Sequence, residues 1–207
     1  MQRVHATVQR SLKARQELAL WLPGAGRGDE VERAQGAGTD NVRGVLHGEV
    51  IPLARAFNEA RVKTWLIGGQ AVELLCGGAV RAHDDIDFLV RAGDAGRALQ
   101  VLQDLGLTQV HGSLEAGNVF YRRADLLVDV VPVLEQPPRC VGDLAGLTLP
   151  TAFLTDTPVV RDGVSVNTLT PDMHAALKGV VSAFYGAPMR EKDLVDLAAL
   201  RRCGFDG

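Results

Sequence analysis

Hydrophobic residues recur along the chain in two patterns, short apolar runs and longer stretches with helical spacing. Alternating or continuous apolar runs indicate strands, whereas apolar residues three or four positions apart indicate amphipathic helices. Strands are predicted for residues 65–67, 85–90, 107–110, 118–122 and 126–133, with a hairpin over 159–166, and helices for residues 3–22, 42–60, 70–75, 94–105, 171–185 and 189–203. This mixture of elements predicts an α/β (α+β) protein.

Residues 23–40 separate the first predicted helix from the remainder of the chain. This stretch is rich in glycine and charge and poor in bulky apolar residues, which is typical of a linker. Its glycines at 24–28 follow no strand, so a linker is favoured over a nucleotide-binding loop. We therefore divide the chain into an N-terminal helix with a Gly-rich linker, residues 1–40, and a main domain, residues 41–207. Within the main domain, Pro52 predicts a kink or a new helix start.

The stretch from Thr64 to Val90 carries the candidate chemistry. Its first apolar run ends on Gly68 and Gly69, and two glycines after a strand let backbone N–H groups approach an anion at a helix start. Asp85 and Asp87 then open the next strand, where residues two positions apart point to the same face. Adjacent carboxylates repel each other and fit a hard divalent cation such as Mg²⁺, which also binds phosphates. The alternative is a strand end with two solvated acids.

A further acid, Asp129, lies in the middle of the apolar run over residues 126–131. Burying a carboxylate among Val and Leu is costly unless the carboxylate is paired or bound to a metal. The alternative is an Asp that faces solvent from an edge strand.

The glycine pair, a short helix and the D-x-D motif of Asp85 and Asp87 resemble the signature of the nucleotidyltransferase superfamily, to which DNA polymerase beta belongs. The fuller string, residues 65–69 followed by residues 81–87 (RAHDDID), is most similar to aminoglycoside 2″-O and lincosamide adenylyltransferases. The resemblance covers about residues 43–203. In one departure, Gln70 stands where those enzymes usually carry an aromatic residue.

The resemblance implies a nucleotidyltransferase fold, with a small mixed β-sheet flanked by helices and with C-terminal helices. It implies that Asp85, Asp87 and Asp129 are catalytic and hold two Mg²⁺ ions. Asp129 would act as a metal ligand or as the general base. The nucleoside triphosphate, with ATP as the expected donor, would contact Gly68, Gly69, Arg81 and Lys178. The alternative for Lys178 is a solvated helix face.

The last predicted helix contains the string MREKDLVDLAAL, in which Arg190, Lys192 and Asp193 resemble a C-terminal motif of this group. Equally, Glu191, Lys192 and Asp196 fit ordinary surface charges that support a helix. His83 is expected to orient the loop before the D-x-D motif.

The implied reaction is Mg²⁺-dependent transfer of a nucleoside monophosphate to a hydroxyl group of a small molecule, with release of pyrophosphate. An aminoglycoside- or lincosamide-like antibiotic is the expected acceptor class. The alternatives are a toxin-like nucleotidyltransferase that modifies tRNA or a protein, and a non-catalytic member that binds a nucleotide or a partner. A basic groove beside Asp85 would favour RNA, and an acidic cleft would favour a cationic aminoglycoside.

Composition narrows these alternatives. The chain has 207 residues, of which 46% are hydrophobic and 23% charged, and its formal net charge is −3. Nucleic-acid-binding proteins usually carry a basic surface, so nucleic acid is disfavoured as a partner. No apolar run reaches membrane-spanning length and no signal-peptide pattern opens the chain, so no membrane contact is expected. Three distant cysteines without a C-x-x-C motif predict free thiols in a reducing cytoplasm.

Overall fold

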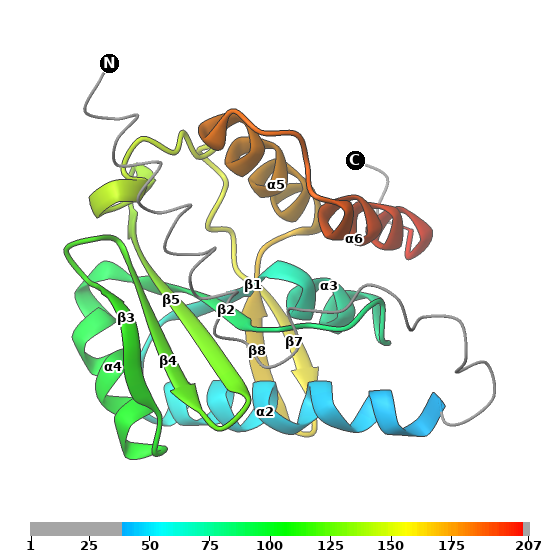
Figure 1. The fold of residues 1–207 in the computed structure, drawn as a ribbon, viewed down its shortest axis with the longest axis horizontal. Coiled ribbons are helices and arrows are strands. Elements are labelled where there is room, and N and C mark those ends of the chain that lie inside the picture. The colour runs from blue at the N-terminus through cyan, green and yellow to red at the C-terminus, as the bar shows by residue number, and fades with distance from the viewer. Residues whose placement is uncertain (1–38, 205–207) are drawn as a thin grey trace. The chain divides into compact units, whose positions relative to one another are not determined.

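The structure, a computed structural model, describes residues 39–204, and their side chains from residue 48 onward. The predicted helix over residues 3–22 and nearly all of the linker lie outside this range, so the division at residue 40 stays a prediction. The helices are α2 (Thr39–Glu59), α3 (Gly68–Cys76), α4 (Ala95–Asp104), α5 (Pro171–Tyr185) and α6 (Glu191–Arg202) (Figure 1). The strands are β1 (Thr64–Ile67), β2 (Ile86–Arg91), β3 (Thr108–Ser113), β4 (Asn118–Arg123), β5 (Leu126–Glu135), β6 (Pro138–Cys140), β7 (Thr157–Arg161) and β8 (Val164–Thr168).

The strands form one mixed sheet in the order β3-β4-β5-β2-β1-β8-β7, and β6 pairs with β5 beside this path. β1 and β2 are antiparallel, whereas β2 is parallel to β5 and β1 is parallel to β8. The hairpins β3–β4, β4–β5 and β7–β8 are antiparallel. The predicted mixed sheet flanked by helices is therefore confirmed. Its central strands β1, β2 and β5 carry or adjoin the predicted glycines and acids.

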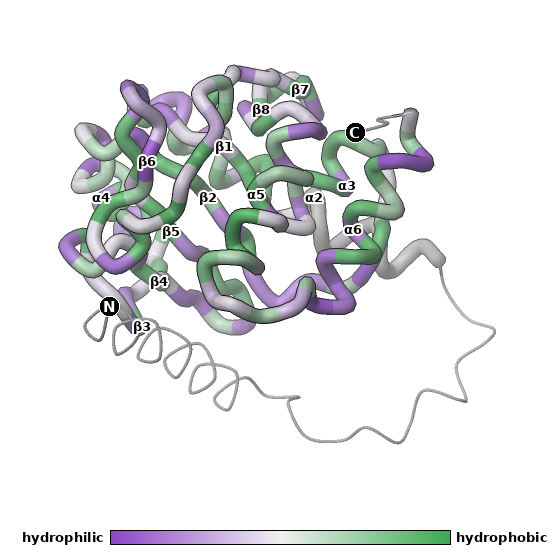
Figure 2. The backbone as a smooth tube through the Cα atoms, turned by 90° about the horizontal axis from the view of Figure 1, so that it is seen from above, coloured by the Kyte–Doolittle hydropathy of each residue, from purple (hydrophilic) through white to green (hydrophobic). Residues whose placement is uncertain are grey.

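Helices cover both faces of this sheet (Figure 1). On one face, Phe57 of α2 packs edge-on against Phe88 of β2, with ring centroids 5.2 Å apart. On the other face, Leu89 of β2 and Val131 of β5 belong to a hydrophobic cluster that includes Leu177 of α5. Figure 2 shows these hydrophobic stretches along the central strands and α5. The sheet therefore has one face beneath α2 and one beneath α5.

Two helices differ from their predicted bounds. α2 continues through Pro52, so no new helix starts there. Pro52 cannot donate to the carbonyl of Gly48, but Gly48 is exposed and water can satisfy that carbonyl. α3 begins at Gly68, which places both glycines in its first turn. Between residues 39 and 204, no helix combines the length and the apolar character needed to cross a membrane.

Cys76 and Cys203 form a disulfide bond, with their Cα atoms 5.6 Å apart. The bond joins the end of α3 to the residue after α6, across a sequence separation of 127. The prediction of three free thiols is therefore wrong for these two cysteines, because folding brings two distant helices together. Cys140 is free and buried, and burial raises the pKa of its thiol to about 11. The cytoplasmic prediction loses its support from cysteine usage and stays a prediction.

Candidate active site

Asp87 and Asp129 lie side by side on the parallel strands β2 and β5, where they are direct partners in the strand register. Their neighbours Phe88 and Val130 belong to the hydrophobic core beneath α2. Because side chains alternate along a strand, both acids point to the opposite face, toward α5. Asp129 is only 2% exposed. The alternative of a solvent-facing edge-strand Asp is therefore wrong, and two carboxylates share one face of the sheet.

Gly68 places the N-terminus of α3 against this acid pair. The preceding residue, Ile67, is the register partner of Asp87 on β1. Gly68 has a left-handed backbone with φ +74°, and a Cβ there would overlap the carboxylate of Asp87. Ile67 provides no side-chain hydrogen bond at the start of α3. The positive end of a helix dipole therefore lies beside Asp87, as expected of an anion-binding turn.

Asp85 lies two residues before Asp87, at the entrance to β2. Its side chain is half-buried and also lines a neighbouring pocket. Within residues 48–204, no three His, Cys, Asp or Glu side chains are grouped so that they could hold a metal ion. The structure thus brings Asp87 and Asp129 together and places Asp85 at the edge of that pair. The three-carboxylate metal site stays a prediction.

Glu73 of α3 fixes the loop that leads to β2. It accepts hydrogen bonds from the backbone N–H groups of Val80 at 2.7 Å and Arg81 at 3.1 Å. Nε2 of His83 lies 2.8 Å from Oε1 of Glu73. Burial raises the pKa of Glu73, but the nearby His83 and the hydrogen bonds from the two backbone N–H groups outweigh burial and hold the pKa below its ordinary value. The loop-orienting role expected of His83 therefore acts through an ionised Glu73.

Gly69 lets the same loop close over the first turn of α3. A Cβ at Gly69 would overlap both the guanidinium of Arg81 and the ring of His83. Arg81 is thereby held against the end of α3 that adjoins Asp87. The glycine pair has two distinct structural uses, since Gly68 accommodates a carboxylate and Gly69 accommodates a cation.

Arg81 and Lys178 converge on Asp196 of α6. Arg81 donates from Nε and Nη2 to the two oxygens of Asp196, at 2.8 and 2.9 Å. Nζ of Lys178 donates to Asp196 at 2.8 Å and to Asp193 at 2.9 Å. The side chain of Lys178 is 9% exposed and that of Asp196 is 0% exposed. The alternatives of a solvated Lys178 and of a surface Asp196 are therefore wrong.

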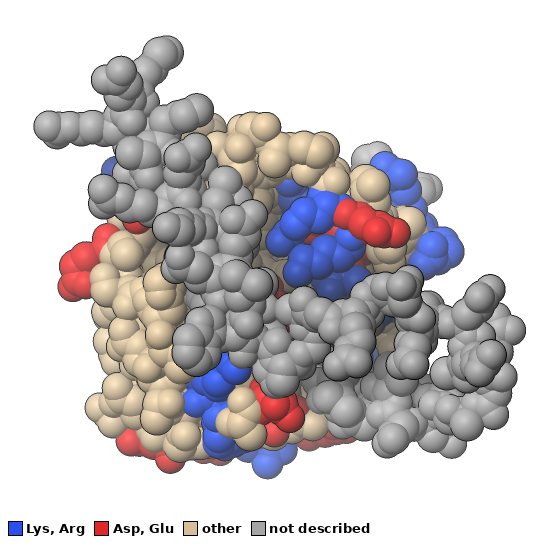
Figure 3. All heavy atoms as spheres, in the orientation of Figure 1, with Lys and Arg blue, Asp and Glu red and all other residues tan. Residues whose placement is uncertain are grey.

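These cations keep both carboxylates ionised. Burial raises the pKa of Asp193, but Arg190 and Lys178 outweigh burial and lower it to about 2. Burial likewise raises the pKa of Asp196, and Arg81 and Lys178 bring it below the ordinary value. Figure 3 shows further Lys and Arg side chains gathered over α6. The region over α6 is therefore rich in cations, although Arg81 and Lys178 are already paired with carboxylates.

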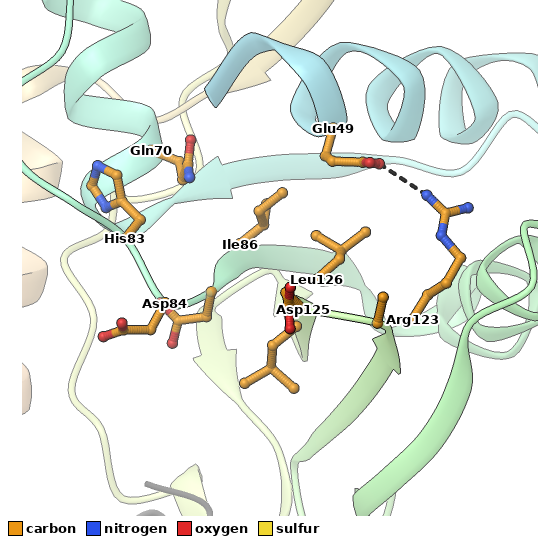
Figure 4. Close-up of a pocket in the computed structure, with 11 residues that line it drawn as sticks. Glu49, Gln70, His83, Asp84, Ile86, Arg123, Asp125 and Leu126 are labelled. Carbon is orange, nitrogen blue, oxygen red and sulfur yellow. Dashed lines mark hydrogen bonds and ion pairs between the residues drawn. The ribbon is translucent and has the colours of Figure 1, made fainter. Parts of the chain in front are cut away.

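A pocket of about 340 Å³ opens beside Asp85, between α2, the start of β2 and the β4–β5 turn (Figure 4). Apolar side chains of Ile86 and Leu126 contribute to its lining. Its charged lining consists of four carboxylates and one guanidinium, Glu49, Asp84, Asp85, Asp125 and Arg123. Arg123 is paired with Glu49 at 3.0 Å. Three carboxylates therefore lie in the pocket without a cation in its lining to balance them, and the pocket is acidic.

Sequence reasoning gave no site role to Glu73 or Asp196. Both stand among apolar residues in helices, in the strings VELL and VDLA. A carboxylate in such surroundings requires a partner. An acid among apolar residues is the signal that singled out Asp129 in its strand. The same signal could have singled out Glu73 and Asp196 in their helices.

A comparison with family models decides the class of the protein. Residues 2–203 match the model of a family described as uncharacterised nucleotidyltransferases. The chain belongs to this nucleotidyltransferase family. No curated protein matches this nucleotidyltransferase.

Solved structures share the fold of this nucleotidyltransferase. It is similar to the lincomycin-bound lincosamide antibiotic adenylyltransferase LnuA, with a TM-score of 0.62 and 17% identity over 75% of this chain and 96% of that chain. It is also similar to ANT(2″)-Ia in complex with adenylyl-2″-tobramycin, with a TM-score of 0.59 and 18% identity over 72% and 84% of the two chains. A solution structure of the antibiotic-resistance factor ANT(2″)-Ia gives a TM-score of 0.57 at 17% identity over 74% and 82%. The predicted nucleotidyltransferase fold is confirmed.

Proposed function

We propose that this nucleotidyltransferase transfers a nucleoside monophosphate from a nucleoside triphosphate, with ATP as the expected donor, to a hydroxyl group of a small cationic molecule. Pyrophosphate is the leaving group. The observation that carries the proposal is the carboxylate pair of Asp87 and Asp129 beside the N-terminus of α3. Carboxylates and a helix N-terminus together favour a metal-bound polyphosphate, because one binds cations and the other binds anions.

The chemistry of the donor set supports Mg²⁺, and Asp85 would have to turn toward Asp87 and Asp129 to complete the site. Carboxylate oxygens are the hard ligands that this cation takes in proteins, and Gly68 leaves room for the carboxylate of Asp87 where any Cβ would fill it. Asp85, Asp87 and Asp129 would hold two such ions. When bound, the metal neutralises the charge of the triphosphate and of the departing pyrophosphate.

The protein's own groups position the reactants. The first-turn amides of α3, at Gly68 and Gly69, would bind phosphate oxygens, and Arg81 would donate to them from the adjoining loop. Lys178 would contribute positive charge from α5. The acceptor oxygen bonds to the α-phosphorus as the bond to pyrophosphate breaks, and Asp129 would take the hydroxyl proton or serve only as a metal ligand. Positioning and charge account for most of the catalysis of such a transfer.

The acidic pocket beside Asp85 supports a cationic acceptor. Four carboxylates and one guanidinium line it, so it attracts positive charge and repels a nucleic-acid backbone. Its volume of about 340 Å³ is within the usual range for small-molecule sites. Ile86 and Leu126 add apolar surface for a sugar ring on the α2 side of the sheet, so the acceptor hydroxyl would reach Asp87 and Asp129 past Asp85, at the start of β2. An aminoglycoside- or lincosamide-like compound has the required hydroxyl groups and amines, which favours this class over tRNA.

A screen of acceptors with α-³²P-labelled nucleotides tests the proposal. We expect a labelled product with an amino-sugar-type hydroxyl compound, dependent on Mg²⁺ and accompanied by release of pyrophosphate. Asp87→Asn should lower the rate at least about 100-fold, because a metal-binding and charge-stabilising group is lost. Asp162→Asn, at an exposed carboxylate in the β7–β8 turn, is the matched control and should retain the wild-type rate.

Other outcomes would select the alternatives. Label on tRNA or on a protein, with none on small molecules, would favour the toxin-like function. Mg²⁺-dependent nucleotide binding without transfer to any acceptor would favour a non-catalytic member. Unchanged Mg²⁺-dependent ATP binding in Asp87→Asn, measured by calorimetry, would remove the site proposed here.

A further inference from the structure

Asp196 joins two cations that come from separate parts of the chain. Its carboxylate is 0% exposed and accepts two hydrogen bonds from Arg81 and one from Lys178. Arg81 belongs to the loop before β2, and Lys178 belongs to α5. Paired N–H donors on a carboxylate fix the geometry of a guanidinium as well as its charge. Asp196 thus sets the position of each cation relative to the other.

Arg81 also has two further carboxylates within electrostatic range. Burial lowers the pKa of Arg81, but Asp196, and after it Asp85 and Asp193, raise it above its ordinary value. The side-chain hydrogen bonds of Arg81 within residues 48–204 nevertheless go to Asp196 and to the carbonyl of Ala82. A guanidinium carries five N–H donors, so Arg81 keeps donors for a further acceptor.

We propose that Asp196 is a positioning residue of the nucleotide site, which holds Arg81 and Lys178 in place beside α6. This inference rests on the proposed function, because it assigns both cations to the triphosphate. Held in this way, Arg81 presents its remaining N–H donors to phosphate oxygens.

A merely stabilising role is a weaker account of this cluster. Taking two charges out of water costs much of what their attraction returns, so a buried ion pair is poor evidence for stability. The cluster does link three separate elements at the end of α3 that adjoins Asp87. Without the charge of Asp196, Arg81 would lose the two acceptor oxygens that fix its guanidinium. The phosphate donor would then be misplaced, and Lys178 would lose one of its two carboxylate partners.

The test compares binding of Mg²⁺-ATP with binding of adenosine, which has no phosphates, in wild type and Asp196→Asn. We expect the variant to bind Mg²⁺-ATP about tenfold to 100-fold more weakly, the effect of one or two charge-assisted hydrogen bonds. Adenosine affinity, measured by ligand-observed NMR, should stay unchanged. Asp172→Asn, at an exposed carboxylate in the first turn of α5, is the matched control and should bind both ligands as wild type does.

Adenosine binding also reports whether the variant is folded. If Asp196→Asn does not fold, Arg81→Lys replaces it, because lysine keeps the charge but loses the paired donors; the same selective loss of ATP binding is expected. Equal losses for ATP and adenosine would show a structural role and overturn the proposal, as would unchanged or tighter ATP binding. Absence of Mg²⁺-ATP binding by the wild type would instead overturn the proposed function, and this inference with it.

Discussion

At the scale of single residues, the candidate site depends on the absence of a side chain at Gly68. Its backbone is left-handed, and the space a Cβ would need is filled by the carboxylate of Asp87. Any substitution of Gly68 therefore lowers the stability of the fold in two ways. It strains the backbone, and it displaces the carboxylate of Asp87. These two effects can be separated, because the chain contains a second glycine with nearly the same backbone.

We predict that Gly68→Ala destabilises the fold and weakens Mg²⁺-dependent ATP binding. The left-handed backbone alone should cost about 1–2 kcal/mol, and moving Asp87 adds to this. Gly163→Ala is the matched control, since Gly163 has φ +71° and nothing within 4 Å of its Cβ position. Urea unfolding should show the backbone cost in both variants, and calorimetry should show weaker ATP binding only at Gly68. Equal ATP affinity in the two variants would contradict the role given to Gly68.

Residues of the site were predictable where the signal is local. The glycine pair follows an apolar run, and the D-x-D acids open the next one, so their neighbourhood follows from strand pairing. Asp129 was marked by its cost in an apolar strand. Asp196 was not assigned, because its pairing with Arg81 joins positions 115 residues apart and depends on how α6 packs. The spacing of residues in the sequence does not indicate which distant residues come into contact in the fold.

At the scale of elements, the apolar periodicity predicted the strands and helices of the main domain except β6, which lies in a stretch rich in Pro and Gly that reads as a loop. The β4–β5 hairpin, with its turn after Arg123, follows the predicted one. The contact between α3 and α6 was not predictable from periodicity, since either helix could bury its apolar side elsewhere. The disulfide of Cys76 and Cys203 closes that contact and holds the α6 carboxylates near the start of β2.

We predict that reducing this disulfide destabilises the protein by about 2–5 kcal/mol, because it frees a long loop in the unfolded chain. Urea unfolding with and without dithiothreitol measures the effect. Cys203→Ser should unfold at the reduced midpoint in both conditions. Cys140→Ala, at the free buried cysteine, should keep the wild-type response to reductant. Identical midpoints for the wild type in both conditions would mean that the bond does not form in solution.

At the scale of the whole molecule, the net charge of −3 is the sum over regions of opposite charge. The pocket beside Asp85 is acidic, whereas Lys and Arg side chains gather over α6 (Figure 3). The interior also holds a buried titratable group in a fixed charge state. His174 is 2% exposed, and its Nε2 lies 2.9 Å from Oγ1 of Thr168, which in turn donates to the carbonyl of Leu66. A hydroxyl that donates onward accepts from His174, so Nε2 carries a proton.

The stability of the fold should therefore fall on acidification in two steps. Burial and, to a smaller extent, Lys178 outweigh the opposing effect of Asp196 and together lower the pKa of His174 to about 3. A group with a lowered folded pKa binds its proton more readily when unfolded, so stability is full above about pH 6.5 and declines below it. Asp193, with a folded pKa of about 2 against an ordinary 3.8, adds a second decline below about pH 4.

We predict that the wild type loses about 2 kcal/mol of unfolding free energy between pH 7.5 and pH 5, most of it through His174. Urea midpoints across this range measure the loss. His174→Gln, whose amide can still donate to Thr168, should be less stable at pH 7.5 but nearly flat down to pH 5. His111→Gln, at an exposed histidine of β3, is the control and should keep the wild-type slope. A wild-type slope in His174→Gln would show that other groups cause the decline, and the assignment of a lowered pKa to the buried His174 would be wrong.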